Sequence, residues 1–351
     1  MISSLKRLSF IAVLCLYNLS AQESVSTDQT QKRIDLAQTI TAEDLSHLLY
    51  RFAADSMQGR MTATPGQKKA AEFLVDFYQK ENITGALPGG GYYQNIPKEY
   101  FKSKYVKTNS ENVVAIIPGS TLPQEYIVIS AHYDHVGAKG DTIYNGADDD
   151  GSGTVALLEI AQAFKRAQDL GMGPKRSIVF LHVTGEEIGL YGSRYYTENP
   201  IYPLDQTVCN LNTDMIGRID PNKAGNDNYI YLIGSDKLSQ ELHDVSEEVN
   251  DTFAQLELDY TFNDENDPNR FYYRSDHYNF AKKNIPIIFY FNGVHEDYHQ
   301  PSDTPDKIEY ALMSKRTQLI FHTAWEVANR EQRIFADKLQ DAQADDGDKK
   351  N

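Results

Sequence analysis

Short apolar runs alternate with amphipathic helical patterns through most of this 351-residue chain, and this alternation restricts the folds available to it. Runs rich in β-branched residues are typical of strands. They read "NVVAII", "EYIVISAHYDH", "RSIVFLHV", "VCNLNTDMI", "NYIYLIG" and "IPIIFYF". Strands that alternate with helices predict an α/β fold, a three-layer sandwich with helices on both faces of a mixed, mostly parallel central sheet.

Five segments between and beside these runs predict helices, three of them with a distinct buried face. In "QKKAAEFLVDFYQKE" the apolar face consists of Ala70, Phe73, Leu74, Phe77 and Tyr78. In "SGTVALLEIAQAFKRA" it consists of Leu157, Ile160, Ala161 and Phe164. In "SKRTQLIFHTAWEVANR" it consists of Leu319, Ile320, Thr323, Ala324 and Val327. We expect a short helix near "GLYGSRYYTEN" and another helix in "KLSQELHDVSEEVND".

Residues 1–21 have the pattern of a secretory signal peptide. Two basic residues precede the apolar run Leu8–Leu16, and Ala21 supplies a small residue at a cleavage point. The run is too short to span a bilayer. A leucine precedes Cys15 where a lipoprotein site requires a small residue, so lipoprotein anchoring is the less favoured alternative. The sequence therefore predicts export, with a periplasmic or extracellular location after cleavage near Ala21.

The rest of the chain reads as one domain with short polar ends. Residues 22–41 are polar and aperiodic and predict a flexible N-terminal lead, whereas 337–351 predict an acidic disordered tail. Residues 42–336 contain no repeat or linker and no further apolar run of membrane-spanning length. The net charge of -16 argues against nucleic acid and anionic membranes as partners.

Acidic and imidazole side chains follow the predicted strands at their carboxyl ends, where ligands bind in parallel sheets. In chain order they are His132, Asp134, Asp149, Glu186, Glu187, Asp214 and His299. Each motif alone has a simpler interpretation: "DDDGSG" is typical of a turn that caps a helix, and "GEEIG" of a helix start. A single histidine is more often a structural hydrogen-bonding group than a ligand. Their joint occurrence in this order favours a metal site.

Formal charge indicates two metal ions. Three carboxylates, from Asp149, Glu187 and Asp214, together with one hydroxide balance two dications when His132 and His299 are neutral. Imidazole and carboxylate are both zinc ligands. A shared carboxylate, here that of Asp149, occurs between ions about 3.5–4 Å apart in co-catalytic hydrolases. We therefore expect two Zn²⁺ per chain.

On these motifs the chain resembles the di-zinc metallo-exopeptidase family of secreted bacterial leucine aminopeptidases. Relatives of that family include glutamate carboxypeptidase, glutaminyl cyclase and transferrin receptor. The resemblance extends over roughly residues 42–330 and rests on "HYD", "GADDDGSG", "GEEIGLYGS", "NTDMIG" and "YHQPSDT". It implies a secreted zinc aminopeptidase, a hydrolase whose substrates are peptides with a free N-terminus.

The resemblance also implies residue roles. The metal ligands would be His132, Asp149, Glu187, Asp214 and His299. Glu186 would be the general base and Asp134 would orient His132, while Arg274 in "RSDH" would contact substrate and Tyr298 would stabilise the oxyanion. A surface ion pair for Arg274 and simple packing for Tyr298 remain open. His135 could compete with His132 as a ligand, but His132 has the family spacing to Asp134.

Three alternative functions also remain open. A carboxypeptidase could use Arg274 to hold a free carboxylate. A glutaminyl-cyclase-like zinc enzyme would have tryptophan before the last histidine, where this chain has Tyr298 and its only tryptophan is Trp325. A non-catalytic binding relative would have lost ligands or the base. Loop 260–273 matches no family pattern, so the preferred side chain is not predicted.

Overall fold

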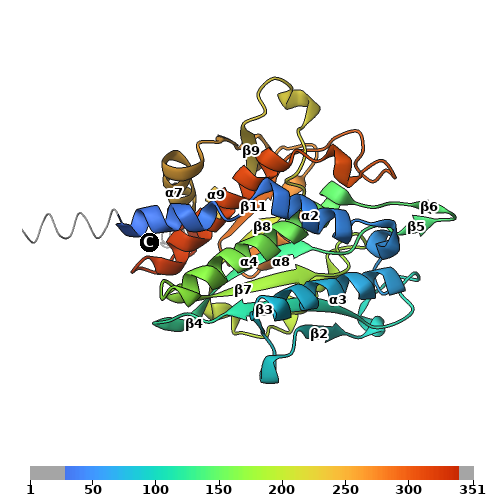
Figure 1. Cartoon of the computed structure of the whole chain (residues 1–351), viewed down its shortest axis with the longest axis horizontal. Helices are drawn as coiled ribbons and strands as arrows, with labels where there is room; N and C mark the ends of the chain where they lie inside the picture. Colours follow the sequence, from blue (N-terminus) through green and yellow to red (C-terminus); the bar gives the residue numbers. More distant parts are fainter. Residues whose placement is uncertain (1–27, 340–351) are drawn as a thin grey trace, which may run out of the picture.

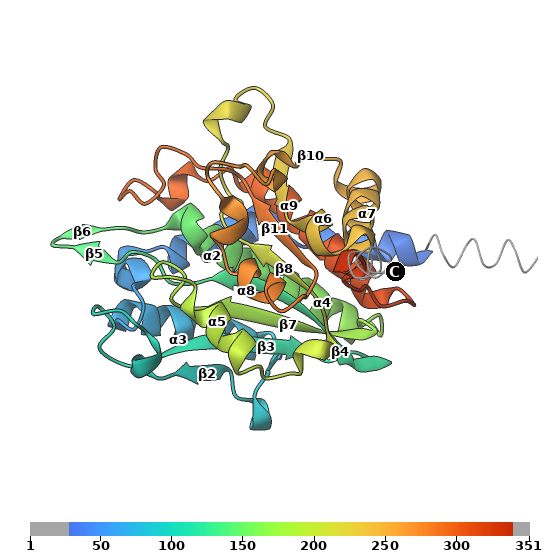
Figure 2. The ribbon, with the colours of Figure 1, turned by 180° about the vertical axis from the view of Figure 1, so that it is seen from behind.

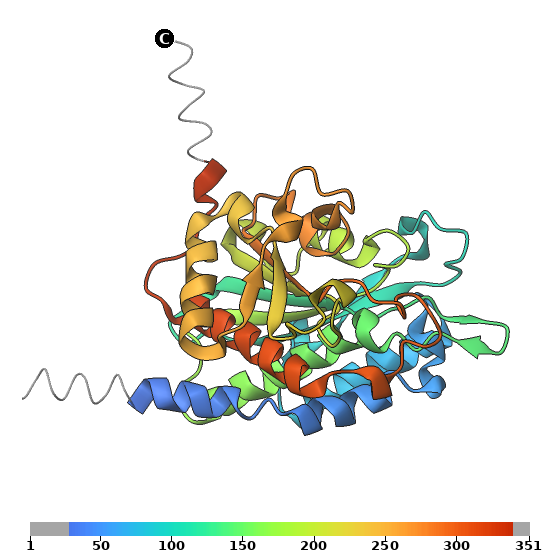
Figure 3. The same ribbon diagram turned by 90° about the horizontal axis from the view of Figure 1, so that it is seen from above.

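The computed structural model describes residues 28–339, which form three layers: helices, a nine-stranded sheet, and a second layer of helices. Figure 1 shows the sheet behind helices α2, α3, α4 and α9, and Figure 2 shows the opposite face, covered by α5 and α8. The view from above separates the layers (Figure 3). Among the described residues, no helix has the length and apolar character needed to cross a bilayer. The predicted three-layer α/β sandwich is confirmed.

The sheet has the strand order β1-β3-β7-β4-β8-β11-β9-β10, with β2 paired to β3. Its strands are β1 (Thr84–Gly85), β2 (Tyr93–Ile96), β3 (Ser110–Ile117), β4 (Leu122–His132), β7 (Arg176–Val183), β8 (Thr207–Thr213), β9 (Tyr229–Ile233), β10 (Glu257–Asp259) and β11 (Ile287–Phe291). The central strands β7, β4, β8 and β11 are parallel, whereas β3 and β9 pair antiparallel to this group. The sheet is therefore mixed, with its parallel part in the centre. A small hairpin of β5 (Ala138–Lys139) and β6 (Thr142–Ile143) projects beyond it (Figure 1).

Register brings the carboxyl ends of the central strands together. Ile129 of β4 lies opposite Phe180 of β7 and Leu211 of β8, and His132 at the end of β4 pairs with Val183. Loops that leave these ends therefore meet at one edge of the sheet. This edge is where the sequence predicts the metal ligands.

The helices are placed by their apolar faces and caps. They are α2 (Ala42–Phe52), α3 (Pro65–Lys80), α4 (Gly153–Asp169), α5 (Tyr191–Glu198), α6 (Ser235–Leu238), α7 (Gln240–Val249), α8 (His277–Ala281) and α9 (Tyr310–Asn329). Thr41 caps α2 by accepting from the backbone N–H of Asp44, and Pro65 starts α3 with a backbone angle already suited to a helix. The segment predicted as one helix over "KLSQELHDVSEEVND" is instead two, because Ser239 adopts an extended conformation and caps α7.

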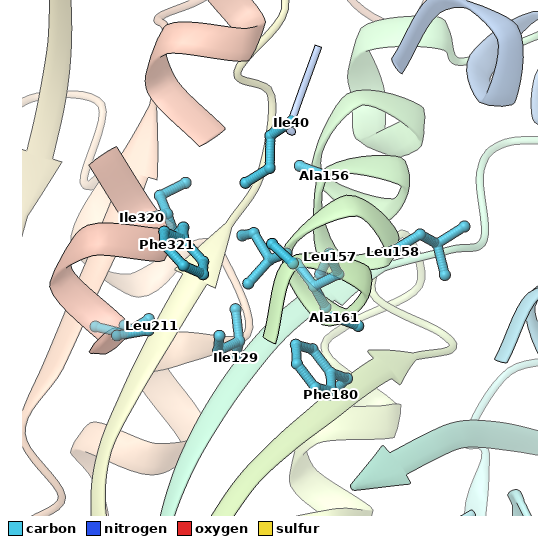
Figure 4. Close-up of a cluster of buried hydrophobic side chains, with 14 of the residues drawn as sticks. Ile40, Ile129, Ala156, Leu157, Leu158, Ala161, Phe180, Leu211, Ile320 and Phe321 are labelled. Carbon is cyan, nitrogen blue, oxygen red and sulfur yellow. The ribbon is translucent and has the colours of Figure 1, made fainter. Parts of the chain in front are cut away.

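The largest apolar core lies between the sheet and α4 and α9. Figure 4 shows Leu157 and Ala161 of α4 above Ile129 and Phe180 of the sheet, with Phe321 of α9 beside them. These side chains are fully buried. The stripes predicted for α4 and α9 are confirmed, whereas Phe73 and Phe77 of α3 are only partly buried.

The prediction of a flexible lead over 22–41 is wrong for its described part. Residues 28–37 are helical, and Leu36 and Ile40 belong to the main core. Arg33 donates to the carbonyl oxygen of His322 at 2.6 Å. The segment is mostly polar and shows no helical periodicity. Its few apolar side chains are buried through contacts with α9, which is distant in the sequence. The predicted signal peptide, 1–21, and most of the predicted tail lie outside the described residues.

Candidate metal centre

The three adjacent aspartates of "GADDDGSG" point in different directions. Asp148 accepts from the backbone N–H of Gly217 at 2.7 Å, and its other oxygen lies 3.0 Å from a ring nitrogen of His295. Asp150 accepts from backbone N–H groups, among them that of His132 at 3.2 Å. Asp149, between them, directs its carboxylate at the imidazoles beyond the strand ends. The outer two aspartates are therefore structural, and Asp149 alone faces the site.

One oxygen of Asp149 belongs to a first donor group at the ends of β4 and β8. His132 Nε2 lies 3.2 Å from Asp149 Oδ1 and 3.6 Å from Asp214 Oδ1. All three side chains are buried, and their donor atoms lie within 4.8 Å of one another. Three convergent N and O donors are a set that zinc accepts, with a coordination position left open.

The other oxygen of Asp149 belongs to a second donor group. His299 Nε2 lies 2.9 Å from Asp149 Oδ2 and 3.1 Å from Glu187 Oε2. His135 Nδ1 lies 2.7 Å from Glu187 Oε1 and 3.8 Å from Asp149 Oδ2. Asp149 is thus common to both groups, which is the arrangement of a bridging carboxylate.

Unsatisfied buried atoms indicate that these groups fit cations. Asp149 Oδ2, Glu187 Oε1 and both ring nitrogens of His135 have no hydrogen-bond partner, although burial without one is costly. Burial alone would raise the pKa of Asp149, but His132 and His299 outweigh it and hold that pKa well below its usual range. Burial lowers the pKa of His299, yet Asp149 and Glu187 outweigh it and raise it to about 10. The site therefore attracts positive charge, which metal ions would supply in place of protons.

Two carboxylate supports were not predicted as site residues. Asp303 accepts from the backbone N–H groups of Asp148 and Asp149, which ties the loop after His299 to the aspartate loop. Ser275 donates to Asp214 Oδ2 at 2.6 Å. Asp303 lies in "YHQPSDT" and Ser275 in "RSDH", two motifs that already contain predicted site residues. Their nearness in sequence to these residues is the only signal by which they could have been predicted.

Asp134 lies beside His132, but its carboxylate is not the closest partner of that ring. His132 Nδ1 lies 3.1 Å from the backbone oxygen of Asp134 and 3.9 Å from its carboxylate. The carboxylate instead accepts from Thr62 Oγ1 at 2.6 Å and from the backbone N–H of Glu186 at 3.2 Å. Burial raises the pKa of Asp134 to about 6, although His132 opposes the shift. Asp134 thus supports both the ring of His132 and the start of the Glu186 loop.

A pocket opens beside the first donor group. Its wall contains His132, Asp149, Glu186, Asp214, Met215, Phe271, Arg274, Phe289, Phe291, Val294 and Tyr298. Burial raises the pKa of Glu186 well above its usual range, with Glu187 and Asp214 adding to the shift and His132 opposing it. A nearby cation would favour the ionised form instead. The pocket therefore places the carboxylate of Glu186, an apolar wall and the donors side by side.

The remaining predicted residues border this pocket. Tyr298 stacks on the ring of His299 with centroids 4.0 Å apart. Arg274 is exposed and its guanidinium lies 5.0 Å from the ring centroid of Phe271. The surface ion pair considered for Arg274 is absent among the ion pairs of the described residues.

The structure brings together all five residues expected to bind metal, with Glu186 at the same pocket. The choice of His132 over His135 for the first donor group agrees with the structure. His135 does not stand in for His132, because it lies in the second donor group, against Glu187.

Known proteins share both the sequence pattern and the fold. Residues 112–324 match the sequence profile of Peptidase family M28. The chain is 29% identical over 303 residues to a probable leucine aminopeptidase of Arthroderma otae, covering 81% of this chain and 76% of that protein. Its fold is similar to that of Legionella pneumophila LapA aminopeptidase, with TM-score 0.67 and 21% identity over 86% of this chain and 76% of that one. A zinc aminopeptidase from Bacillus subtilis gives TM-score 0.65 and 16% identity, over 84% and 98%.

Proposed function

The chain belongs to peptidase family M28, and from this premise we propose that it is an exported aminopeptidase that uses two zinc ions. Its substrates would be peptides with a free N-terminus, from which it releases the first residue. One observation carries the proposal: the two oxygens of Asp149 serve two separate donor groups at the carboxyl edge of the sheet. The apolar run Leu8–Leu16, followed by Ala21, supports export.

Two groups of residues would hold the ions. His132, Asp149 and Asp214 would hold the first, and Asp149, Glu187 and His299 the second. When bound, zinc supplies Lewis acidity, which lowers the pKa of water and polarises a carbonyl group. Such chemistry requires a protein group that moves the proton of the attacking water.

Glu186 is the carboxylate best placed to move that proton. It borders the pocket, belongs to neither donor group, and its backbone N–H is fixed by Asp134. It would take a proton from water and deliver one to the leaving amine. Tyr298, at the same wall, would donate its hydroxyl to the developing oxyanion. Burial raises the pKa of Tyr298, so its hydroxyl stays protonated and able to donate at neutral pH.

The shape and charge of the pocket favour an aminopeptidase substrate. Its carboxylates attract the ammonium group at the start of a peptide. Met215, Phe271, Phe289 and Phe291 form an apolar wall that suits an apolar first side chain. The similarity to a probable leucine aminopeptidase supports the same preference.

A carboxypeptidase is the second candidate, and Arg274 is the observation that favours it. This exposed guanidinium at the pocket wall could hold a free carboxylate. A glutaminyl-cyclase-like activity has less support, because Tyr298 occupies the position of the expected tryptophan.

Three matched peptides test the proposal. They share one sequence that begins with leucine: one has both ends free, one is acetylated at the N-terminus, and one is amidated at the C-terminus. We expect the zinc-loaded protein to release leucine from the first and third, and a chelator to abolish this release. Release of the C-terminal residue from the first and second peptides, with the amidated peptide left intact, would replace the proposal by the carboxypeptidase. Conversion of an N-terminal glutamine peptide without hydrolysis would replace it by the cyclase.

A further inference from the structure

His135 is a buried imidazole that the proposed mechanism does not use. Its side chain is 0% exposed, and neither ring nitrogen has a hydrogen-bond partner. A neutral imidazole carries one donor and one acceptor, and leaving both unsatisfied in the interior is costly. The ring therefore requires a partner of another kind.

The ring points into the second donor group. His135 Nδ1, Asp149 Oδ2 and Glu187 Oε1 are all buried atoms without a hydrogen-bond partner. One donor atom from each of these three residues lies within 4.8 Å of the other two. Nδ1 is only 2.7 Å from Glu187 Oε1, yet the two atoms are not aligned as a hydrogen bond. Three unsatisfied donors that converge in this way match the ligand set of a cation.

The backbone around His135 leaves space for this ring. A Cβ on Gly146 would lie 2.5 Å from Cγ of His135 and 2.6 Å from its Cδ2, so only glycine fits there. Arg60 holds both segments in place: its backbone oxygen accepts from His135 N at 3.4 Å, and its guanidinium donates to Gly146 O at 2.8 Å. The imidazole is thus fixed beside Glu187.

We propose that His135 is a fourth protein ligand of the second ion, through Nδ1. This inference rests on the proposed two-zinc function. The second site then has four protein ligands, His135, Asp149, Glu187 and His299, whereas the first has three, His132, Asp149 and Asp214. Zinc sites with four protein ligands are closed, and those with three keep an open position. The second site therefore binds zinc more tightly, and the first provides the open position that a substrate oxygen needs.

Zinc titration of three phenylalanine variants tests this assignment without an activity assay. His135→Phe keeps a ring beside Gly146 but removes the nitrogens, His132→Phe removes a first-site ligand, and His182→Phe is a control at a buried histidine that contacts Tyr78. The metal-free proteins are equilibrated with zinc buffers, and bound zinc per chain is measured. We expect two steps for the wild type and the control. In His135→Phe the tighter step weakens at least ~10-fold, whereas in His132→Phe the weaker step is lost.

Unchanged zinc binding by His135→Phe would overturn the assignment. If that variant melts below the wild type in chelator, His135→Asn replaces it, because the smaller amide fits beside Gly146 and is a poor zinc ligand; the same two outcomes then decide. Loss of the tighter step together with a wild type that cleaves no peptide would support His135 and reject the proposed function. Peptide cleavage by the wild type, with zinc binding unchanged in His135→Phe and His135→Asn, would support the proposed function and reject His135 as a ligand.

Discussion

Strands β4, β7 and β8 contribute both to the apolar layer under α4 and to the charged edge at their carboxyl ends. Burial stabilises the first region and opposes the charges of the second. In β4, Ile129 packs under α4 (Figure 4), and three residues later His132 faces Asp149 and Asp214. Under α4, each buried leucine, isoleucine or phenylalanine contributes about 1.5–3 kcal/mol to stability. At the edge, burial acts against the charged groups, raising the pKa of Asp150 well above its usual range. The comparison indicates that the layer stabilises the fold, whereas the edge gathers charged groups that burial disfavours.

The largest predicted effect is on kcat, and it comes from replacing Glu186, the proposed base at the charged edge. We expect Glu186→Gln to lower kcat by about 10²–10⁴-fold, because the amide cannot accept the proton of water. Stability should not fall, since the substitution removes a buried negative charge beside Glu187 and Asp214. Initial rates on a leucyl chromogenic substrate, with zinc content and melting temperature, measure all three quantities.

Glu159→Gln is the matched control, since Glu159 is a buried glutamate of α4 that lies outside both donor groups. Its kcat should equal that of the wild type. A fully zinc-loaded Glu186→Gln protein with kcat near that of the wild type would show that another group moves the proton.

The second prediction changes the apolar layer and not the edge. Phe180 is fully buried and packs against Tyr78 and the core under α4. We expect Phe180→Ala to lower the free energy of unfolding by about 3–5 kcal/mol, through lost burial and a residual cavity. Urea denaturation measures this, and kcat per folded molecule at 15 °C should stay within about twofold of the wild type. A large loss of kcat in protein that is still folded would contradict the separation of the two regions.

Much of this contrast is readable in the sequence, because both regions depend on local patterns. The run "RSIVFLHV" coincides with β7, and the 3.6-residue period predicts the stripe of α4. The helix over residues 28–37 was missed because its burial depends on Arg33 and Leu36 docking near α9, about 290 residues later. Local periodicity carries no information about such a distant partner.

The candidate site shows the same limit. Strand ends and motifs bring the expected ligands to one edge, as parallel register requires. Three hydrogen bonds at the site join residues far apart in the sequence. Ser275 and Asp214 are 61 residues apart, Thr62 and Asp134 are 72 apart, and Asp303 and Asp148 are 155 apart. No spacing rule relates such pairs. His135 was read as a rival of His132 because sequence proximity does not say which oxygen of Asp149 a ring will face.

Arg60 tests whether the two regions can be uncoupled, because it contacts both. Its fully buried guanidinium lies 4.5 Å from the ring centroid of Phe52 in α2. It also donates to the carbonyl oxygens of Tyr133, Asn145 and Gly146, in the segment between β4 and the aspartate loop. A lysine ammonium cannot reach all of these acceptors. We expect Arg60→Lys to lower the free energy of unfolding by about 3 kcal/mol and to weaken zinc binding as well.

Chemical denaturation in chelator and a zinc titration separate the two effects of Arg60→Lys. A variant that loses stability but binds zinc as tightly as the wild type would confine Arg60 to a structural role.

The last predicted effect concerns a buried acid on the apolar side, which belongs to neither donor group. Glu159 is 3% exposed, its Oε2 has no hydrogen-bond partner, and burial raises its pKa to about 8, with Asp44 adding to the shift and Arg166 opposing it. In the unfolded chain a glutamate releases its proton near pH 4.5. Between pH 4.5 and 8 the unfolded state is therefore ionised while the folded state retains the proton, so Glu159 reduces stability increasingly as pH rises.

Glu159→Gln removes this titration. Denaturation in chelator should give nearly equal stabilities for the variant and the wild type at pH 4.5, and a variant more stable by about 4 kcal/mol at pH 8, since each unit of the pKa shift from 4.5 to about 8 corresponds to about 1.4 kcal/mol. A Glu→Gln substitution at the edge should not give this gain in stability at pH 8 once zinc is present, because bound cations favour the ionised carboxylates there. If Glu159→Gln gave the same gain at both pH values, the stabilisation would come from packing and not from charge, and the distinction between an acid that a cation can offset and one that it cannot would fail.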